Sequence, residues 1–300
     1  MKKKTYLFAL MAMALTLGSC SDNENGIGGE ASKYITVSTS IGNMTRVATD
    51  AKGGQTFEES DEISVYAWTG APTVAPETSE RVVNNAINKL TNGSWISTPQ
   101  MLWKNNREKH YFIGVYPTAA ISDLSAGEYT FDVNKQTESD LLVAVNKDGI
   151  SYNADEQQTV PLTFTHVMAK LVVNLTYKNQ WGGIPTVEKV VVGNAAKEAT
   201  INYLTKVVTP STTAKEDFSL PEITENTKYV SVIIPQEEVK QLTIVIGGKN
   251  FVYDNGTPFK LESGKITTVN LEVGRDEIKL GDVKITDWED GSTFSGEAIN

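Results

Sequence analysis

The sequence predicts an all-β fold made of two antiparallel β-sandwich domains in tandem. Apolar and polar residues alternate with a period of two, as in Ile35–Ile41 and Ile63–Trp68, and this is the period of a half-buried strand. Glycine-containing dipeptides typical of tight turns separate the alternating segments. At roughly 150 residues per domain, a chain of 300 residues is expected to form about two domains.

The expected strands succeed one another along the chain and are rich in Val, Ile, Thr and aromatic residues, which suit a pleated, half-buried surface. After the first two, they are Tyr111–Tyr116, Leu141–Val145, Val160–Thr165, Leu171–Tyr177, Val187–Val192, Tyr229–Ile234, Leu242–Ile246, Phe251–Tyr253 and Ile266–Val273. Asn255-Gly256 predicts the clearest hairpin, over Phe251–Phe259. Only Arg81–Leu90 has the spacing of a short amphipathic helix, and Pro210–Asp217 is expected to be a loop. A soft boundary near residue 170 predicts domains over 33–170 and 171–300.

The N-terminus has the features of a bacterial lipoprotein signal. Three lysines precede the apolar run Tyr6–Leu17, which is shorter than the roughly 20 residues of a membrane-spanning helix. The run ends in Leu17-Gly18-Ser19-Cys20, which looks like a lipobox, in which the cysteine thiol receives a diacylglycerol. We therefore expect a signal peptide over 1–19 and a lipidated Cys20 with a flexible tether over 20–32. An ordinary signal peptide with an incidental cysteine is the alternative.

The acidic segment Ser21–Asn25 resembles an export tag of surface lipoproteins, which predicts an outer-membrane, cell-surface location; a plain polar tether is the alternative. The net charge is −10, and without residues 1–19 the chain has 24 basic against 37 acidic side chains. Such an acidic chain is unsuited to nucleic acid, because phosphate contacts need a positive face. Cys20 is the only cysteine, and His110 and His166 are not spaced as metal ligands. We expect no metal, no cofactor and no enzymatic activity.

Six segments occur in a recognisable order: Met44-Thr45-Arg46, Phe57 with Asp61–Tyr66, Trp103 with Tyr111–Pro117, Asp140–Ala144, Val160–Leu171 and Ile285–Trp288. With the lipobox before them, they resemble the fimbrillin family of Bacteroidales surface lipoproteins, the subunits of type V pili. Val160–Leu171 is similar to the family's V-x-L-x-F-x-H-x-M-A-K-L segment. The likeness is strongest over 44–175. Gly114 and Val115 stand where the family often has Ala and Tyr.

The resemblance implies two transthyretin-like β-sandwich domains and a mechanism of assembly. The lipoprotein would reach the surface with an N-terminal strand occupying a groove in its own first domain. A trypsin-like protease would cut after an arginine and release that strand, and the groove would then accept a strand from another subunit. A sandwich that lacks a strand exposes unpaired backbone groups and an apolar slot, so strand addition is physically sound.

Specific residues match these roles. A cut at Arg46–Val47 would release the alternating residues Ile35, Val37 and Ile41 and free the chain from its lipid; an ordinary surface arginine is the alternative for Arg46. The candidate donor strand lies within 277–300, with anchors at Ile278, Leu280, Val283, Ile285 and Trp288. Its alternation changes phase at Gly281-Asp282, where a bulge would fit. The alternative is that this segment is an edge strand of its own domain.

The resemblance therefore predicts a structural subunit of cell-surface fimbriae that contributes to adhesion. Its expected partners are other fimbrial subunits, an arginine-specific surface protease, the outer membrane through the lipid, and a host or bacterial surface receptor. The alternative is a surface glycan-binding lipoprotein of a polysaccharide-uptake system, which an exposed row of aromatic side chains would favour. A surface glycoside hydrolase would need two carboxylates facing each other at about 5–9.5 Å.

Overall fold

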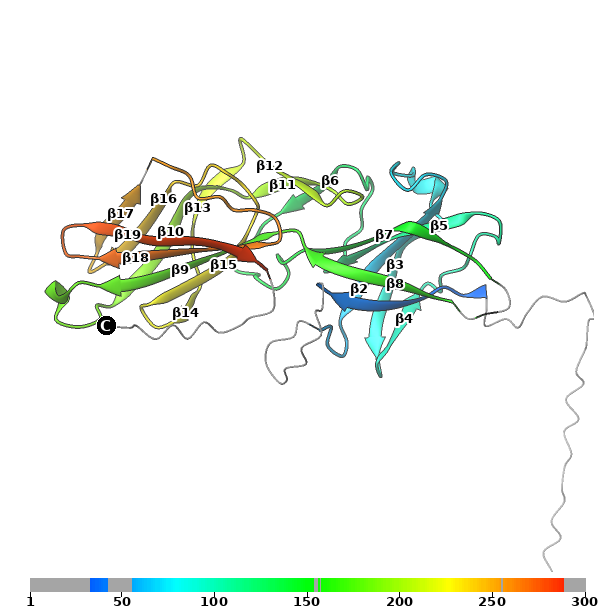
Figure 1. The fold of residues 1–300 in the computed structure, drawn as a ribbon, viewed down its shortest axis with the longest axis horizontal. Helices are drawn as coiled ribbons and strands as arrows, with labels where there is room; N and C mark the ends of the chain where they lie inside the picture. The colour runs from blue at the N-terminus through cyan, green and yellow to red at the C-terminus, as the bar shows by residue number, and fades with distance from the viewer. Residues whose placement is uncertain (1–32, 43–55, 154–155, 157, 255, 289–300) are drawn as a thin grey trace, which may run out of the picture.

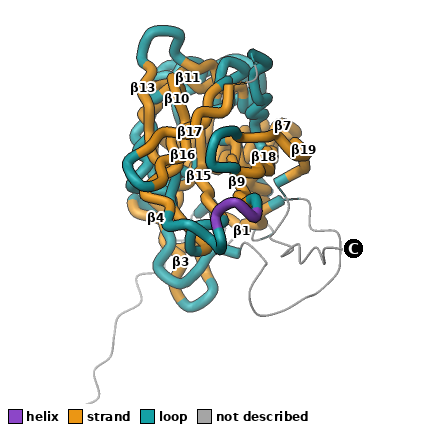
Figure 2. Tube along the Cα trace, turned by 90° about the vertical axis from the view of Figure 1, so that its left-hand side faces the viewer, coloured by secondary structure: helices purple, strands orange, loops and turns teal. Residues whose placement is uncertain are grey.

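The computed structural model describes residues 33–42, 56–153, 156, 158–254 and 256–288. Nearly all of the regular structure in these ranges is β, which confirms the predicted fold class. The two described 3-10 turns, η2 (Thr78–Glu80) and η3 (Asn179–Trp181), have three residues each, and strands dominate the trace in Figure 2. The strands gather in two lobes along one long axis, with the earlier strands in one lobe and the later strands in the other (Figure 1).

The N-terminal lobe is built on one seven-stranded sheet. Its order is β1 (Thr36–Ile41), β8 (Thr159–His166), β7 (Leu142–Ser151), β5 (Lys109–Tyr116), β2 (Glu62–Thr69), β3 (Val83–Thr91) and β4 (Ser94–Thr98). The sheet curls until its two ends meet, because Tyr34 forms an antiparallel bridge with Leu102 and Trp95 Nε1 donates to Thr39 Oγ1 at 3.0 Å. A core that includes Val65 and Phe164 fills the inside of the curl.

The C-terminal lobe is a sandwich of two sheets. One sheet has the order β14 (Glu222–Thr224), β15 (Lys228–Ile233), β9 (Ala169–Tyr177), β18 (Lys265–Val273) and β19 (Ile278–Asp287); the other has β13 (Lys215–Ser219), β10 (Val187–Ala196), β16 (Gln241–Ile246) and β17 (Lys249–Asp254). Alternate side chains of these strands, such as Val173 and Ile244, are fully buried, as expected for strands that bury one face. Two pairs among the described strands, β1 with β8 and β9 with β18, are parallel rather than antiparallel.

A small third sheet connects the lobes. It consists of β6 (Gly127–Thr130), β11 (Glu198–Asn202) and β12 (Val207–Pro210). In the sequence, β6 lies between β5 and β7 of the first sheet, but it pairs with β11. The N-terminal part of the chain thus adds a strand beside the C-terminal sandwich. Buried residues of both lobes, among them Ile113 and Val190, belong to one continuous apolar cluster.

Three local expectations were wrong. Arg81–Leu90 is not helical: it contains most of β3, and a bulge with Asn85 at φ 56° puts buried residues at Val83 and Ala86, the i, i+3 spacing of a helix. The hairpin over Phe251–Phe259 does not form; Gly247-Gly248 instead joins β16 to β17, and the Phe259 N–H donates to Val239 O at 2.7 Å. The predicted loop Pro210–Asp217 overlaps β12 and β13.

Candidate assembly surfaces

The side chains of the predicted N-terminal strand are part of the first core. Ile35 is 2% exposed and Val37 is 6% exposed, and both pack in the cluster that contains Leu162 and Phe164. Ile41 is partly buried against the same cluster. Alternate residues of β1 therefore point inward, as the period of two predicts. The strand fills an apolar slot in its own lobe.

Hydrogen bonds hold β1 on one side and the residues just before it on the other. On one side it runs parallel to β8, with a register from Thr36 opposite Thr159 to Ile41 opposite Phe164. On the other side, the Ile35 N–H donates to Met101 O at 2.9 Å, and the Trp103 N–H donates to Lys33 O at 3.3 Å. Removal of β1 would therefore open the curled sheet along one line and expose backbone groups on both walls.

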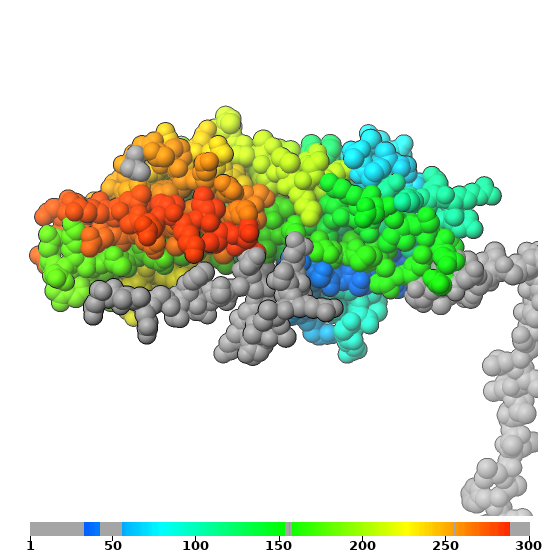
Figure 3. Space-filling model, in the orientation of Figure 1, coloured from blue at the N-terminus to red at the C-terminus, as the bar shows by residue number. Residues whose placement is uncertain are grey.

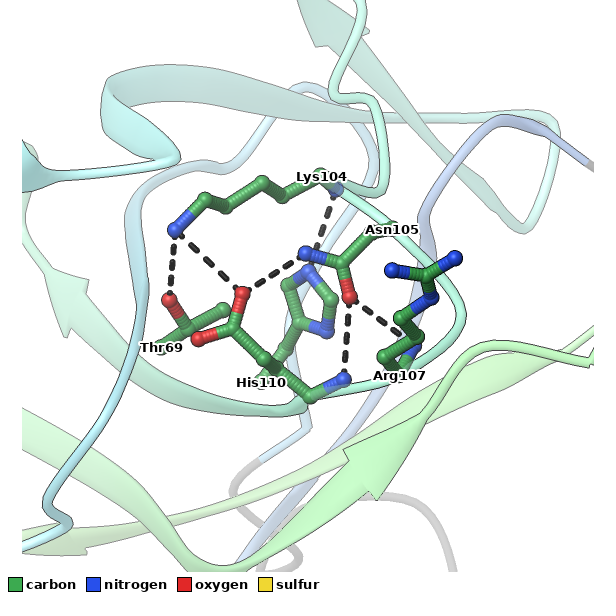
Figure 4. Close-up of polar contacts among 6 residues, drawn as sticks. Thr69, Lys104, Asn105, Arg107 and His110 are labelled. Atoms are coloured by element: carbon green, nitrogen blue, oxygen red, sulfur yellow. Dashed lines mark hydrogen bonds and ion pairs between the residues drawn. The ribbon is translucent and has the colours of Figure 1, made fainter.

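A polar loop fixes the segment 101–103 that receives β1. Figure 4 shows Asn105 turned back on its own loop, where Asn105 Oδ1 accepts from the backbone N–H groups of Arg107 (2.8 Å) and Glu108 (2.9 Å). The backbone N–H of Lys104 donates to Nε2 of buried His110 at 3.1 Å. Burial lowers the pKa of His110, so the imidazole is neutral at pH 7 and its Nε2 is an acceptor. His110 is therefore a buried residue that helps to hold this loop.

The predicted donor residues lie on β19, an edge strand that pairs antiparallel with β18. The register shifts between Val269 and Leu271, opposite the predicted bulge at Gly281-Asp282. Ile278, Leu280, Val283 and Ile285 face Val273, Leu271, Val269 and Thr267 respectively, and those four partners are all buried. Since directly opposed residues share a face, the bulge brings all four donor anchors to the core side of the sheet.

The two halves of β19 are covered to different extents. Ile278 and Leu280 pack against the main core, whereas Val283 is 41% exposed and Ile285 is 39% exposed. Figure 3 shows β19, in red, along the surface of its lobe. The second half of the strand is thus an edge with a partly uncovered apolar face, a feature that favours pairing with another strand.

Trp288 follows the last residue of β19. With Asp140, His166 and Lys170 it forms what we call the Trp288 cluster. The indole lies flat on the His166 imidazole, with centroids 4.0 Å apart and planes 6° apart. Asp140 Oδ1 lies 2.8 Å from His166 Nδ1, and Lys170 Nζ lies 5.3 Å from the Trp288 ring centroid. Burial lowers the pKa of Lys170. The cluster connects the end of β19 to β8 through His166, to β9 through Lys170 and to the chain before β7 through Asp140.

Three of the segments that suggested the family meet in this cluster. Asp140 begins Asp140–Ala144, His166 and Lys170 lie in Val160–Leu171, and Trp288 ends Ile285–Trp288. Trp288 was expected to be an anchor of the donor strand. The parts of Asp140 and Lys170 were not anticipated, because no local pattern indicates which distant side chain will cover a given tryptophan.

The lipidation and processing residues lie outside the described residues: Cys20, Arg46 and Val47 all belong to the ranges 1–32 and 43–55. In the described part of the chain, no helix is long and apolar enough to cross a membrane. In the same part, no group of three or more His, Cys, Asp and Glu side chains could hold a metal. Tyr34 is the only aromatic residue of the described ranges with more than a third of its surface exposed.

Comparison with known proteins identifies the family. A family model described as fimbrillin-like matches residues 45–288, which is most of the chain. The chain belongs to the fimbrillin-like family. The resemblance expected from the ordered segments is thereby confirmed. No curated protein sequence matches this fimbrillin-like chain.

Solved structures of similar fold include proteins from three Bacteroides species. A proposed cell adhesion protein from Bacteroides uniformis is 18% identical with a TM-score of 0.61, over 78% of this chain and 94% of that one. A proposed cell adhesion protein from Bacteroides ovatus is 18% identical with a TM-score of 0.62, over 85% and 98%. A fimbrial protein from Bacteroides vulgatus is 13% identical with a TM-score of 0.52, over 84% and 99%. At these identities the likeness shows the fold alone.

Proposed function

We propose that this fimbrillin-like chain is a structural subunit of cell-surface fimbriae of the type V pilus class, assembled by protease-triggered strand exchange and contributing to adhesion. The observation that supports the proposal is that Val37 of β1 and Ile35 just before it are buried in the first core, and that the segment with Arg46 follows β1 in the sequence. The chain would have two domains, over 33–170 and 171–300, and would be held at the outer membrane through Cys20 before processing.

The energetics of β1 explain why a cut is required. Full burial of an aliphatic side chain stabilises a fold by about 1.5–3 kcal/mol, so Ile35 and Val37 together resist release. In the uncut chain β1 is also tethered to the slot, at an effective concentration on the order of millimolar. A cut between Arg46 and Val47 would remove that tether. A competing strand could then replace β1 and restore both the ladder and the apolar contacts.

The geometry of β19 suits the donor part. Ile278 and Leu280 on one side of the bulge, and Val283 and Ile285 on the other, each repeat the i, i+2 spacing of the slot residues Ile35 and Val37. As an edge strand, β19 has one neighbour to leave. We propose that β19 of one subunit enters the slot vacated by β1 of the next. The partners are other fimbrial subunits, an arginine-specific surface protease, and a host or bacterial surface receptor for adhesion.

The test is limited proteolysis of the chain without residues 1–19 by an arginine-specific protease. We expect Val47 as the new N-terminal residue, followed by a ladder of oligomers on size-exclusion chromatography. Arg46→Gln should abolish both results. Arg107→Gln, at an exposed arginine of the loop in Figure 4, is the matched control and should change neither. If Arg46 stays intact, or the cut product stays monomeric, the proposal is wrong.

A further inference from the structure

A groove of about 530 Å³ lies beside the third sheet, which connects the two lobes. Its lining comes from β12 and the turn residue Lys206 before it, and from the segments 235–238 and 261–263. The Lys206 ammonium donates to Thr165 Oγ1 of β8 at 3.0 Å, so the groove borders the N-terminal lobe. Its volume lies within the range of about 300–1,000 Å³ that ligand clefts occupy, and no assembly role proposed above uses it.

The open surface inside this groove is mainly apolar. On β12, Val207 is 55% exposed, and Val208 and Pro210 are half-buried. Pro235 and Leu261, from the other two segments of the lining, are buried. The aliphatic groups of β12 are therefore within reach of a partner from solvent, and apolar surface gathered in one groove is typical of an interaction site.

The groove also borders an unpaired strand edge. Hydrogen-bonded pairs alternate along an antiparallel ladder, and the Ser211 N–H donates to Glu198 O at 2.8 Å. Because Thr209 lies opposite Thr200 in the same register, the backbone of Thr209 points to β11, and the N–H and C=O groups of Val208 point away from it. Among the described strands, β12 pairs with β11 alone. The outer edge of β12 can therefore accept an added strand.

The charges of the lining favour neither a strongly acidic nor a strongly basic partner. Lys206 and Lys215 are accompanied by Glu237, Glu238 and Glu262. Lys215 and Glu238 form an ion pair with each other. Polyanions such as nucleic acid, and polybasic segments, are thus poor candidates, and an extended segment with apolar side chains suits the groove better.

The described chain ends beside this groove. The Trp288 N–H donates to Gly264 O at 3.0 Å, and Gly264 directly follows Ser263 of the lining. Figure 1 shows that the end of β19 lies near the junction of the lobes. The twelve residues 289–300 follow in the sequence and include Phe294. An extended segment of that length reaches about 40 Å, which is long enough to run from Trp288 into the groove.

We infer that residues 289–300 add an extended strand to the edge of β12 in their own chain, with Phe294 in the groove against Val207. The added strand pairs with the backbone N–H and C=O groups of Val208, and its apolar side chains cover the aliphatic lining. The contact itself does not depend on strand exchange. Its consequence rests on the proposed function: when β19 leaves as a donor, this tail has to leave the groove with it, which adds a second restraint to that of Trp288.

The first test is amide hydrogen exchange on the uncut chain, read residue by residue by NMR. We expect the Val208 N–H to be protected although it lies on an edge strand, and Phe294→Ser to remove this protection. Thr209, whose N–H points to β11, is the internal reference and should not change. Thr293→Ser is the matched control and should leave Val208 protected. Exchange of Val208 at the rate of an open amide in the unsubstituted chain, or equal protection in Phe294→Ser, would overturn the inference.

A mixing experiment identifies whose tail occupies the groove. In a Cys20→Ser background, Gly296→Cys carries a nitroxide, and the methyl signals of Val207 and Val208 are recorded. We expect these signals to lose intensity when the nitroxide and the isotope label are in one molecule, and to keep it when they are in different molecules that are mixed. Val74, exposed in the loop after β2 and outside the lining, is the reference. An equal loss in the mixture would assign the groove to the tail of a second copy and overturn the inference, as would no loss in either sample.

Val207 provides a test from the side of the groove. Val207→Asn should restore the Val208 methyl signal in the nitroxide-labelled chain, because the polar amide removes apolar contact with the tail. Val207→Leu keeps that contact and should leave the loss of intensity unchanged. Both substitutions are at a position that is more than half exposed, so the fold should tolerate them. Equal signals in the two variants would contradict an apolar contact between the tail and β12.

Discussion

Trp288 offers the sharpest test of how β19 is held. Trp288→Ala removes the stack on His166, worth about 0.5–1.5 kcal/mol beyond buried area, and the Lys170 contact, worth about 0.5–1 kcal/mol. The loss of about 1–2.5 kcal/mol should fall mainly on the end of β19, because β19 pairs with one strand, whereas β8 with His166 and β9 with Lys170 each pair with two. Local opening should therefore rise by about 5- to 70-fold.

Hydrogen–deuterium exchange on the uncut chain measures this opening directly. The readout is the exchange of β19 amides relative to those of β5, which lies in the buried middle of the first sheet. Trp95→Ala is the matched control: Trp95 packs on Phe57 and donates to Thr39 of β1, so its loss should speed exchange in β1 and leave β19 unchanged.

Two results would refute the reasoning. If β19 exchanges less than about twofold faster in Trp288→Ala, the stack does not restrain the strand. If β5 accelerates as much as β19, Trp288 supports the whole fold and not the release of one strand. Both results are readable before any protease is added, so they are independent of whether the chain assembles.

The other predictions concern the neutral histidine, a close approach in the core, and a lock on the edge strand. Burial lowers the pKa of His110 from 6.5, so the stability that the neutral imidazole contributes is full above pH 6.5 and is lost as the pH falls toward the folded-state pKa. His110→Gln should flatten this part of the pH dependence of the free energy of unfolding, measured in urea. An unchanged slope would contradict the prediction. Gly114→Ala introduces the residue that the family often has, but puts a Cβ 2.6 Å from the Phe164 ring. It should lower the free energy of unfolding in urea by about 1–3 kcal/mol, and adding Phe164→Leu should restore part of this. An unchanged free energy would mean that the ring can move. Glu272 and Lys279 are opposed, exposed residues of β18 and β19. A disulfide between Glu272→Cys and Lys279→Cys, in a Cys20→Ser background, should leave cleavage intact and stop oligomer formation until reductant is added. Oligomers under oxidising conditions would exclude β19 as donor.

The strands could be predicted because each one carries its own signal. Val160–Thr165 and Ile266–Val273 alternate strongly, and they became the greater part of β8 and β18. The choice of neighbours carries no comparable local signal. The parallel pairings of β1 with β8 and of β9 with β18, and the pairing of β6 with β11, join residues far apart in the chain. They depend on which apolar faces meet in the folded lobe, and alternation alone does not encode that.

The two bulges show where pattern reading succeeds and where it fails. At Gly281-Asp282, alternation breaks between two clear apolar pairs and a glycine is present, so a bulge was predicted and the register shift confirms it. At Asn85 the extra residue is an asparagine with positive φ. This bulge was not predicted, because Val82, Ala86 and Leu90 have helical spacing, although only Ala86 of the three is buried.

The burial of the two strands implies an order of events in the proposed assembly. Val37 of β1 and Ile35 just before it are almost wholly buried, whereas Val283 and Ile285 of β19 are about two-fifths exposed. Strand β1 pairs with β8, and Lys33 and Ile35 just before it form hydrogen bonds with Trp103 and Met101, whereas β19 pairs with β18 alone among the described strands. In the proposed exchange, release of β1 would therefore open a buried slot, which is the reason that a covalent cut would come first. Release of β19 would break its ladder with β18 and the contacts of Ile278, Leu280 and Trp288.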